Sequence, residues 1–292
     1  MRPLRSLLST PANRPRMLEK ALTCGADAIA VDLEDSVPAA EKPRGRELAR
    51  ELLADHGDDA VLYVRVNPID SEHVAEDVAA VVAPGLVGVQ LPKVSGPEDV
   101  LALGELLDAA ERAAGMPNGS VEVLVSIESA LAVVKAFEIL SASPRVGSAM
   151  PGVAENGDLQ RELGYEHTPD EVGLFHTRAS VLVAARAAGI TNPIDGVYGR
   201  VDDDDGFVAT ATIARRLGYR GKKVIHPRHA LLANQVFMPS EAELEFHRRV
   251  LDALDEAERR GSAATVVDGA MVDTAMAATA RQALAWAAGG GT

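Results

Sequence analysis

Short apolar runs alternate with longer segments of helical periodicity along most of the chain. The stretches "VLYVRVN", "LVGVQLPK" and "VEVLVSIE" are apolar enough to be strands of a covered parallel sheet. The expected strands occupy residues 4–10, 27–33, 60–66, 86–92, 121–128, 145–150, 193–198 and 222–226. The expected helices that follow them occupy residues 14–23, 41–54, 71–83, 97–114, 129–141, 171–188, 207–217 and 228–236.

The pattern contains eight strand-then-helix units in about 235 residues. It predicts an α/β fold of the (β/α)₈ TIM-barrel class. The alternative is an open, doubly wound sheet. That fold usually carries a glycine-rich phosphate turn after its first strand. Here the first strand runs into "STPANRP", which contains no glycine, so the barrel is favoured.

The end of the chain has a different pattern. We expect a helix from Ser240 to about Arg260, with Glu243 at the capping-box position, then a short link "GSAATVVDGAMVD" and a final helix over 274–287. The sequence therefore predicts a barrel domain over residues 1–238 and a C-terminal helical extension over 239–292. This extension is too short for a core of its own, so we expect it to pack on the barrel or on an adjacent subunit.

Composition narrows the functional class. The 292 residues are 47 % hydrophobic, which is ample for a sizeable core, and the formal net charge of −14 argues against nucleic acid or an anionic membrane surface as a partner. The single cysteine, Cys24, cannot form a disulfide framework within one chain. No apolar run is long enough to span a membrane, and Pro11 interrupts the apolar start, so we expect a cytoplasmic protein.

Polar residues gather where the predicted strands end. They are Asp32, Glu34 and Asp35 after the second strand, Arg65 and Asn67 after the third, Lys93 after the fourth, Glu128 after the fifth, Glu155 and Asp158 after the sixth, Asp195 near the end of the seventh, and His226 after the eighth. In a barrel these ends meet on the face that carries the chemistry. Clustered carboxylates repel one another unless a cation lies among them, and their oxygens suit Mg²⁺ or Mn²⁺. The Arg65 guanidinium is suited to binding a substrate carboxylate in two places.

Each of these residues also has a purely structural explanation. Glu128 could pair with Lys93 or Arg65, and Asp158 could begin a helix as its N-cap. Asp32 could be a turn residue and His226 a packed core histidine. Lys93 could instead be the Schiff-base lysine of a metal-free aldolase, although the nearby carboxylates favour a role in neutralising one of them.

Seven motifs follow one another in an order that resembles a known family. They are "SLLSTPANRPRMLEKA", "DLEDSVPAAEK", "VRVN", "LPK", "IES", "GDLQRELG" and "GKKVIHPRHALLANQVFMPS". From about residue 5 to residue 276, the chain is similar to the citrate lyase β-chain family, which includes malyl-CoA and citramalyl-CoA lyases within the HpcH/HpaI aldolase group. The resemblance implies a Mg²⁺-dependent lyase on a (β/α)₈ barrel, assembled as a homotrimer or hexamer. Such enzymes break or form a carbon–carbon bond between an acyl-CoA thioester and a 2-oxo acid.

The resemblance also assigns residues at the centre of the site. Glu128 and Asp158 match the metal ligands, which also contact the substrate. Arg65 matches the arginine that holds the oxo-acid carboxylate. Glu34 and Asp35 match acidic residues beside the metal that act through its waters.

Further matched residues lie in the flanking segments. Asp273 matches an acid/base aspartate that is delivered to a neighbouring subunit's site. Arg5, Lys20 and His226 match regions that bind the CoA arm.

Several positions depart from the family pattern. Ser9 and Ala12 differ from the usual first-strand motif, and Ala270 stands where lysine is usual. The segment "SAMPGVAEN" before Asp158 is longer than usual, so Glu155 remains an alternative second metal ligand. Two other functions therefore stay open: a metal-dependent aldolase that acts on a non-CoA substrate, and a non-catalytic subunit that binds a partner.

Overall fold

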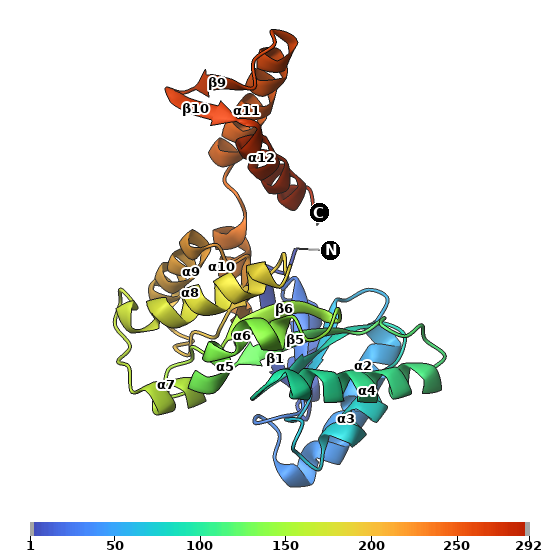
Figure 1. The fold of residues 1–292 in the computed structure, drawn as a ribbon. Coiled ribbons are helices and arrows are strands. Elements are labelled where there is room, and N and C mark those ends of the chain that lie inside the picture. The colour runs from blue at the N-terminus through green and yellow to red at the C-terminus, as the bar shows by residue number, and fades with distance from the viewer. Residues whose placement is uncertain (1–2, 290–292) are drawn as a thin grey trace. The chain divides into compact units, whose positions relative to one another are not determined.

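The computed structural model describes residues 3–289. The chain divides into two compact units, Leu4–Phe237 and the segment from Met238 onward. Figure 1 shows the helices and strands of both units along the chain. Each unit is described separately below.

The first unit is a TIM-barrel-like sheet of eight parallel strands, as the sequence predicts. The strands are β1 (Ser6–Pro11), β2 (Ala28–Asp32), β3 (Leu62–Arg65), β4 (Leu86–Leu91), β5 (Glu122–Ile127), β6 (Val146–Pro151), β7 (Ile194–Asp195) and β8 (Gly221–Val224). Their hydrogen-bonded order is β6-β5-β4-β3-β2-β1-β8-β7. Strands β6 and β7 face each other across the remaining seam, where Ser148 Oγ donates to Asn192 O over 2.8 Å, so the barrel is nearly closed.

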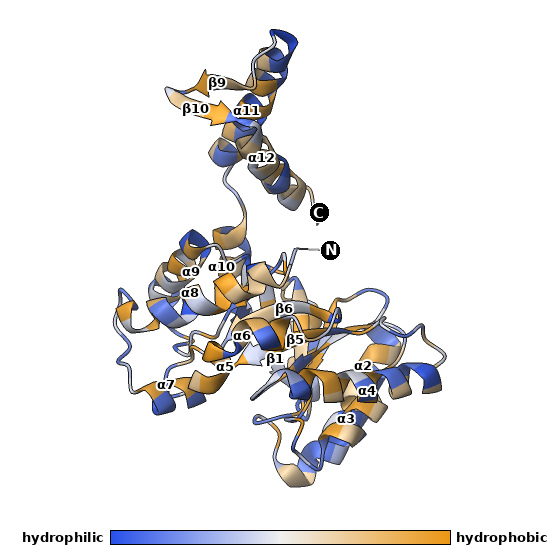
Figure 2. Cartoon of the chain, viewed as in Figure 1, coloured by the Kyte–Doolittle hydropathy of each residue, from blue (hydrophilic) through white to orange (hydrophobic). Residues whose placement is uncertain are grey.

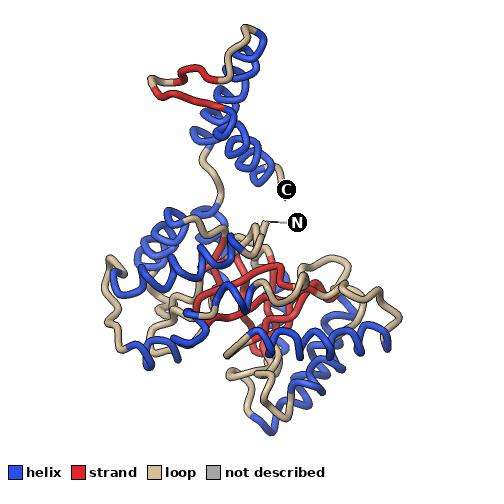
Figure 3. The backbone as a smooth tube through the Cα atoms, viewed as in Figure 1, coloured by secondary structure: helices blue, strands red, loops and turns tan. Residues whose placement is uncertain are grey.

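Helices follow the strands and surround them (Figure 3). They are α1 (Pro15–Leu22), α2 (Lys42–His56), α3 (Val74–Val81), α4 (Pro97–Ala113), α5 (Ala130–Val134), α6 (Ala136–Leu140), α7 (Asp158–Leu163), α8 (Val172–Ala187), α9 (Asp204–Leu217) and α10 (Pro227–Phe237). The helix expected over 129–141 is two short helices that meet at Lys135. Helix α7 is the helix that the structural explanation of Asp158 anticipated, with Gly157 as its N-cap and Asp158 as its first residue.

Apolar side chains form two layers in the barrel unit. The larger layer lies between the strands and the helices and includes Val64, Leu91 and Leu103. Figure 2 shows the corresponding mixture of apolar and polar residues on surrounding helices such as α4 and α8. A smaller cluster fills the barrel interior with side chains that include Leu7 and Leu124. This arrangement follows from the alternation of side chains along each strand, which sends successive residues to opposite faces.

One end of the barrel interior is closed by a tyrosine and a glutamate. Tyr63 of β3 donates its hydroxyl hydrogen to Glu122, the first residue of β5. Burial and the neighbouring Glu122 raise the pKa of Tyr63 well above its usual value, so its hydroxyl remains protonated. Gly88 leaves room for this pair, because a Cβ there would lie 2.7 Å from both side chains.

The second unit is a helix, a hairpin and a second helix: α11 (Glu241–Arg259), β9 (Ala264–Val267), β10 (Ala270–Asp273) and α12 (Thr274–Ala287). The predicted capping box of α11 is present, since Ser240 Oγ accepts from Glu243 N and the Glu243 carboxylate accepts from Ser240 N. The segment expected as a plain link is an antiparallel hairpin. Val250, Val267 and Val272 belong to a small apolar cluster of this unit.

None of the helices within residues 3–289 is long and apolar enough to cross a membrane. Helix α8 begins at Val172, within one residue of the predicted start, and Glu171 at its N-cap adopts a left-handed φ of 49°. The Glu171 carboxylate pairs with Arg178 and makes no hydrogen bond that caps the helix.

Candidate active site

Asp32 and Arg65 form the centre of the polar cluster at the carboxyl ends of the strands. They lie opposite each other in the β2–β3 pairing. Arg65 Nε donates to Asp32 Oδ1 over 2.7 Å, and Arg65 Nη2 donates to Asp32 Oδ2 over 2.5 Å. The pair is bidentate and charge-assisted, which fixes the plane of the guanidinium.

The surroundings of Asp32 keep it ionised although it is buried. Burial on its own would raise the pKa of this carboxyl, but hydrogen bonds and charge from Arg65 outweigh that effect and lower the pKa to about 2. Ser36 Oγ and the Glu34 backbone N–H also donate to the carboxylate. Asp32 is therefore the residue that orients Arg65, as well as a turn residue.

Glu34 lies between two cations. Its Oε2 is 2.7 Å from Arg65 Nη1, and its Oε1 is 2.6 Å from Lys93 Nζ. Lys93 Nζ also lies 3.0 Å from Oδ1 of the largely exposed Asp35. Arg65 and Lys93 thus offset two of the three negative charges of Asp32, Glu34 and Asp35, so the clustered carboxylates are held together by ion pairs and keep one uncompensated charge.

Lys93 connects this cluster to Glu128. Its backbone adopts a left-handed φ of 52°, which is unusual for a residue with a side chain, and its N–H donates to Glu128 Oε2 over 3.0 Å. The ion pairs with Glu34 and Asp35 outweigh partial burial and raise the pKa of Lys93, so its amine is protonated. A protonated amine is a poor nucleophile, which argues against Lys93 as a Schiff-base lysine.

Glu128 follows β5 and lies close to the chain that leaves β6. Burial raises the pKa of its carboxyl, and the Lys93 N–H and the Arg65 charge only partly offset that effect. Gly152 lies against it, since a Cβ at that position would come within 2.7 Å of Glu128 Cγ. Glu128 is therefore a carboxylate in low-dielectric surroundings that lacks a full complement of cationic charge.

Two residues support the acidic turn: Asn67, which the sequence predicts at a strand end, and Lys42, which it does not single out. Lys42 Nζ donates to the carbonyl oxygens of Leu33 (2.8 Å) and Glu34 (3.1 Å) and to Asn67 Oδ1 (2.7 Å). Asn67 in turn donates to Leu33 O over 3.1 Å. Lys42 is the last residue of the quoted motif "DLEDSVPAAEK" and the first residue of α2, so the sequence alone does not show that its side chain returns to the acidic turn.

The two candidates for a second metal ligand are paired elsewhere. Asp158 begins α7 and forms an ion pair with Arg161. Glu155 lies 3.1 Å from Arg200, and this ion pair lowers the pKa of its carboxyl. Helix α7 returns to the end of β5, where Glu162 accepts from Ala130 N over 2.9 Å. Within residues 3–289, no three His, Cys, Asp or Glu side chains are grouped closely enough to hold a metal ion.

The remaining predicted residues lie apart from this cluster or on other elements. Arg5 precedes β1, at the opposite end of the strand, and its guanidinium binds Asp27 through Nε (2.8 Å) and Nη2 (2.7 Å). Lys20 is exposed on α1, and His226 follows β8 at the same end as Glu128. Asp273 belongs to the second unit, where its Oδ1 accepts from Ala275 N and Met276 N as the N-cap of α12. Their proposed roles stay predictions.

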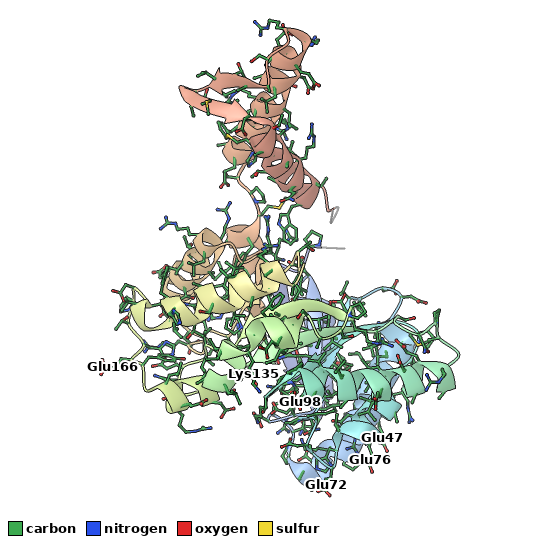
Figure 4. All side chains as sticks on the ribbon, viewed as in Figure 1. Glu47, Glu72, Glu76, Glu98, Lys135 and Glu166 are labelled. Atoms are coloured by element: carbon green, nitrogen blue, oxygen red, sulfur yellow. The ribbon has the colours of Figure 1, made fainter. Side chains whose placement is uncertain are left out.

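The charged residues of the barrel unit have two kinds of surroundings. Glutamates such as Glu72 and Glu166 point outward from their helices and loops in Figure 4. Asp32 and Glu34, by contrast, are each only 2 % exposed. The structure thus places Asp32 and Glu34 of the acidic motif "DLED" inside the fold, whereas Asp35, the last residue of the motif, is exposed.

The donor set fits Mg²⁺ in type. Mg²⁺ is usually bound by one or two carboxylates and completes its octahedron with water and substrate oxygens. Glu128 supplies a partly buried carboxylate whose charge is incompletely balanced, and Asp158 lies at the start of a helix that contacts α5. That Glu128 and Asp158 hold the ion together stays a prediction, and it requires Asp158 to leave Arg161.

Comparison with known proteins identifies the family. The profile of the HpcH/HpaI aldolase/citrate lyase family matches residues 5–227. A protein named (3S)-malyl-CoA thioesterase from Cereibacter sphaeroides is 40 % identical over 285 residues, covering 97 % of this chain and 94 % of that protein. Citrate lyase subunit beta from Leuconostoc mesenteroides is 37 % identical over 272 residues, covering 92 % and 88 %. The chain belongs to the HpcH/HpaI aldolase/citrate lyase family and is an enzyme of the lyase type.

Solved structures show the same fold. The protein CitE from Mycobacterium tuberculosis, in complex with magnesium, acetoacetate and coenzyme A, superposes with a TM-score of 0.76 at 29 % identity and 97 % coverage of both chains. The citrate lyase beta subunit from the same organism, complexed with oxaloacetate and magnesium, gives a TM-score of 0.65 at 26 % identity, covering 81 % of this chain and 98 % of that one.

Proposed function

We propose that the protein is a Mg²⁺-dependent carbon–carbon lyase that cleaves a 3-hydroxyacyl-CoA, of the malyl-CoA, citramalyl-CoA or citryl thioester type, into an acyl thioester and a 2-oxo acid, or forms it in reverse. The observation that carries the proposal is the Asp32–Arg65 pair beside Glu128 at the carboxyl ends of the strands. The magnesium, oxo-acid and coenzyme A complexes of the Mycobacterium tuberculosis relatives support it.

Each residue of the cluster has a role in this reaction. Arg65, oriented by Asp32, binds the carboxylate of the oxo acid. Bound by Glu128 and Asp158, Mg²⁺ supplies Lewis-acid polarisation of the oxo-acid carbonyl. Lys93 and Arg65 offset part of the negative charge of Asp32, Glu34 and Asp35, which lowers the electrostatic cost of bringing an anionic substrate and enolate into the site.

Proton transfer is assigned to the second unit. In the cleavage direction, Asp273 takes the proton from the hydroxyl group at the scissile carbon. The carbon–carbon bond then breaks, its electron pair forms the thioester enolate, and the enolate carbon is protonated to give the acyl thioester. We propose that Asp273 serves a neighbouring subunit of a homotrimer or hexamer, and that Lys20 and His226 contact the CoA arm. Arg5 contributes to that arm only if it leaves Asp27.

The test is a product analysis with and without metal. We expect malyl-CoA or a related thioester to yield a 2-oxo acid and an acyl-CoA in equal amounts, with activity lost in EDTA and restored by Mg²⁺ or Mn²⁺. Activity that survives EDTA intact would contradict the metal mechanism. Turnover of only free aldehydes would favour the non-CoA aldolase, and absence of turnover on all of these substrates would favour a partner-binding subunit.

A second candidate is hydrolysis of the thioester bond. The relative that is 40 % identical is named a (3S)-malyl-CoA thioesterase, and it covers nearly the whole chain. Hydrolysis of malyl-CoA gives malate and free CoA, whereas the lyase reaction gives glyoxylate and acetyl-CoA. Quantifying free thiol and oxo acid in the same reaction therefore separates the two activities.

A further inference from the structure

A row of polar side chains crosses the barrel interior next to the candidate active site. Lys223 Nζ on β8 donates to Gln90 Oε1 on β4 over 2.8 Å, and Gln90 Nε2 donates to Ser126 Oγ on β5 over 2.8 Å. All three residues are buried. Gln90 lies opposite Arg65 in the β3–β4 pairing, and Ser126 precedes Glu128 by two positions, so both neighbour the site.

Lys223 differs from the lysine beside it. Successive residues of a strand point to opposite faces, so Lys222 and Lys223 have different surroundings. Lys222 Nζ binds the Asp195 carboxylate, which Arg178 of α8 also binds. Lys223 donates to a neutral amide, and within residues 3–289 its ammonium group forms no ion pair. A buried ammonium group is usually paired with a carboxylate. Lys223 is an exception, and its position therefore requires an explanation.

The charged groups that act on the Lys223 ammonium belong to the candidate active site. Burial, and repulsion from Arg65, lower the pKa of Lys223 to about 7, while Asp32, Glu128 and Glu34 raise it. At about pH 6 the group is therefore mostly charged. A cation in these surroundings attracts an anion that enters the site and repels a second cation, and low local polarity strengthens both effects.

We propose that Lys223 is a positioning and specificity-determining residue of the Arg65–Glu128 centre: held by Gln90, its ammonium favours an anionic oxo-acid ligand and disfavours a divalent cation that binds without one. The inference rests on the proposed function, since it assumes that Mg²⁺ and a 2-oxo acid share this centre. The ammonium of Lys223 would make the binding of Mg²⁺ and of the oxo acid cooperative, because the anion offsets the repulsion between Lys223 and the metal ion.

The test is calorimetric titration of the full chain at about pH 6, with MgCl₂ alone and then with pyruvate at saturating Mg²⁺. Lys223→Gln removes the charge and keeps an N–H donor for Gln90. We expect this variant to bind Mg²⁺ alone about two- to fivefold more tightly and pyruvate about five- to tenfold more weakly, whereas neutral methyl pyruvate should bind as it does to the wild type. Changes of opposite sign are not expected from a purely structural role.

The control is Lys135→Gln, which makes the same change of net charge at the junction of α5 and α6 (Lys135 is labelled in Figure 4). The affinities of Lys135→Gln for Mg²⁺ and for pyruvate should stay within about twofold of the wild-type values, because a surface substitution changes stability only slightly. If Lys223→Gln does not fold, Lys223→Met, which keeps the length of the side chain, is measured instead.

Three outcomes would overturn the inference. Equal affinities in Lys223→Gln and the wild type would show that the ammonium has no effect on the site. Loss of both ligands together would indicate a structural role, and borohydride trapping of pyruvate on Lys223 would indicate covalent chemistry. If the wild type itself binds neither Mg²⁺ nor pyruvate, the proposed function fails first, and the two failures are thereby distinguished.

Discussion

Arg65 binds both carboxylate oxygens of Asp32 and still directs a third nitrogen, Nη1, toward Glu34 at 2.7 Å. The guanidinium is thus held in one plane by a residue of the neighbouring strand, while one edge of it faces the cluster. A ligand carboxylate that reaches this edge must share it with Glu34 or displace it. If the site binds an oxo acid as proposed, its affinity therefore depends on the geometry of Arg65 as well as on its charge.

Arg65→Lys should show this dependence directly. A lysine keeps the charge but cannot bind Asp32 and a ligand through a planar fork. We expect KM for the 2-oxo acid, measured in the condensation direction, to rise about 10- to 100-fold. The matched change Arg145→Lys lies before β6, where Arg145 binds Glu111 and Asp108, and it should lower the melting temperature without raising this KM. Equal KM values for Arg65→Lys and the wild type would contradict the assignment.

Asp32 should contribute to stability in a pH-dependent way. Its folded pKa of about 2 lies below the ordinary value of 3.8, so its contribution is present above about pH 4 and is lost as the pH falls toward 2. The shift corresponds to about 2 kcal/mol of unfolding free energy. In Asp32→Asn, chemical denaturation between about pH 5 and pH 2 should show a weaker dependence on pH than in the wild type. Superimposable pH profiles for the two proteins would show that the pair does not hold Asp32 ionised.

Lys93→Met tests whether Mg²⁺ can replace the ammonium of Lys93 in offsetting the negative charge of Glu34. The variant keeps the unusual backbone conformation but leaves Glu34 with Arg65 alone. We expect a loss of about 1–2 kcal/mol of unfolding free energy, between the values for exposed and buried ion pairs. Added MgCl₂ should then raise the melting temperature of the variant more than that of the wild type. Lys93→Arg, which retains the charge, should respond to MgCl₂ as the wild type does.

Asp273 has a structural role that must be separated from catalysis. Its carboxylate caps α12, and asparagine caps a helix about as well as aspartate does. Asp273→Asn should therefore retain the wild-type melting temperature within a few degrees and still lose about 10²- to 10⁴-fold in kcat, because the amide cannot accept the proton. Asp273→Ala should lose the cap as well, at a cost of about 1 kcal/mol. If the Asp273→Asn enzyme is fully active, Asp273 has only a structural role, as the N-cap of α12.

The strands and the acidic motif could be predicted because their signals are local. Each strand is a short apolar run, and parallel strands bring Asp32, Arg65 and Glu128 to one end whatever the details of packing. The role of Lys223 was also accessible in principle, since two successive lysines in a strand must face opposite sides. Its partner Gln90 was not, because 133 residues separate them and only the closure of the barrel brings them together.

Other features depended on tertiary contacts or on a signal that was overlooked. The ion pair between Glu171, at the start of the expected helix 171–188, and the buried Arg178 could not be predicted from the local sequence. The hairpin in the second unit has an Asp268–Gly269 turn with φ angles of 51° and 81°. An Asp-Gly pair between apolar residues is a recognised hairpin signal, so this element was predictable from the sequence.

The Tyr63–Glu122 pair at the far end of the interior also bears on the route by which products leave. Tyr63 belongs to the same buried apolar cluster as Leu7, Leu124 and Ile194, so the interior there is a packed core rather than a pore. Under the proposed function, both products of one cleavage would therefore leave on the side of Arg65 and Glu128.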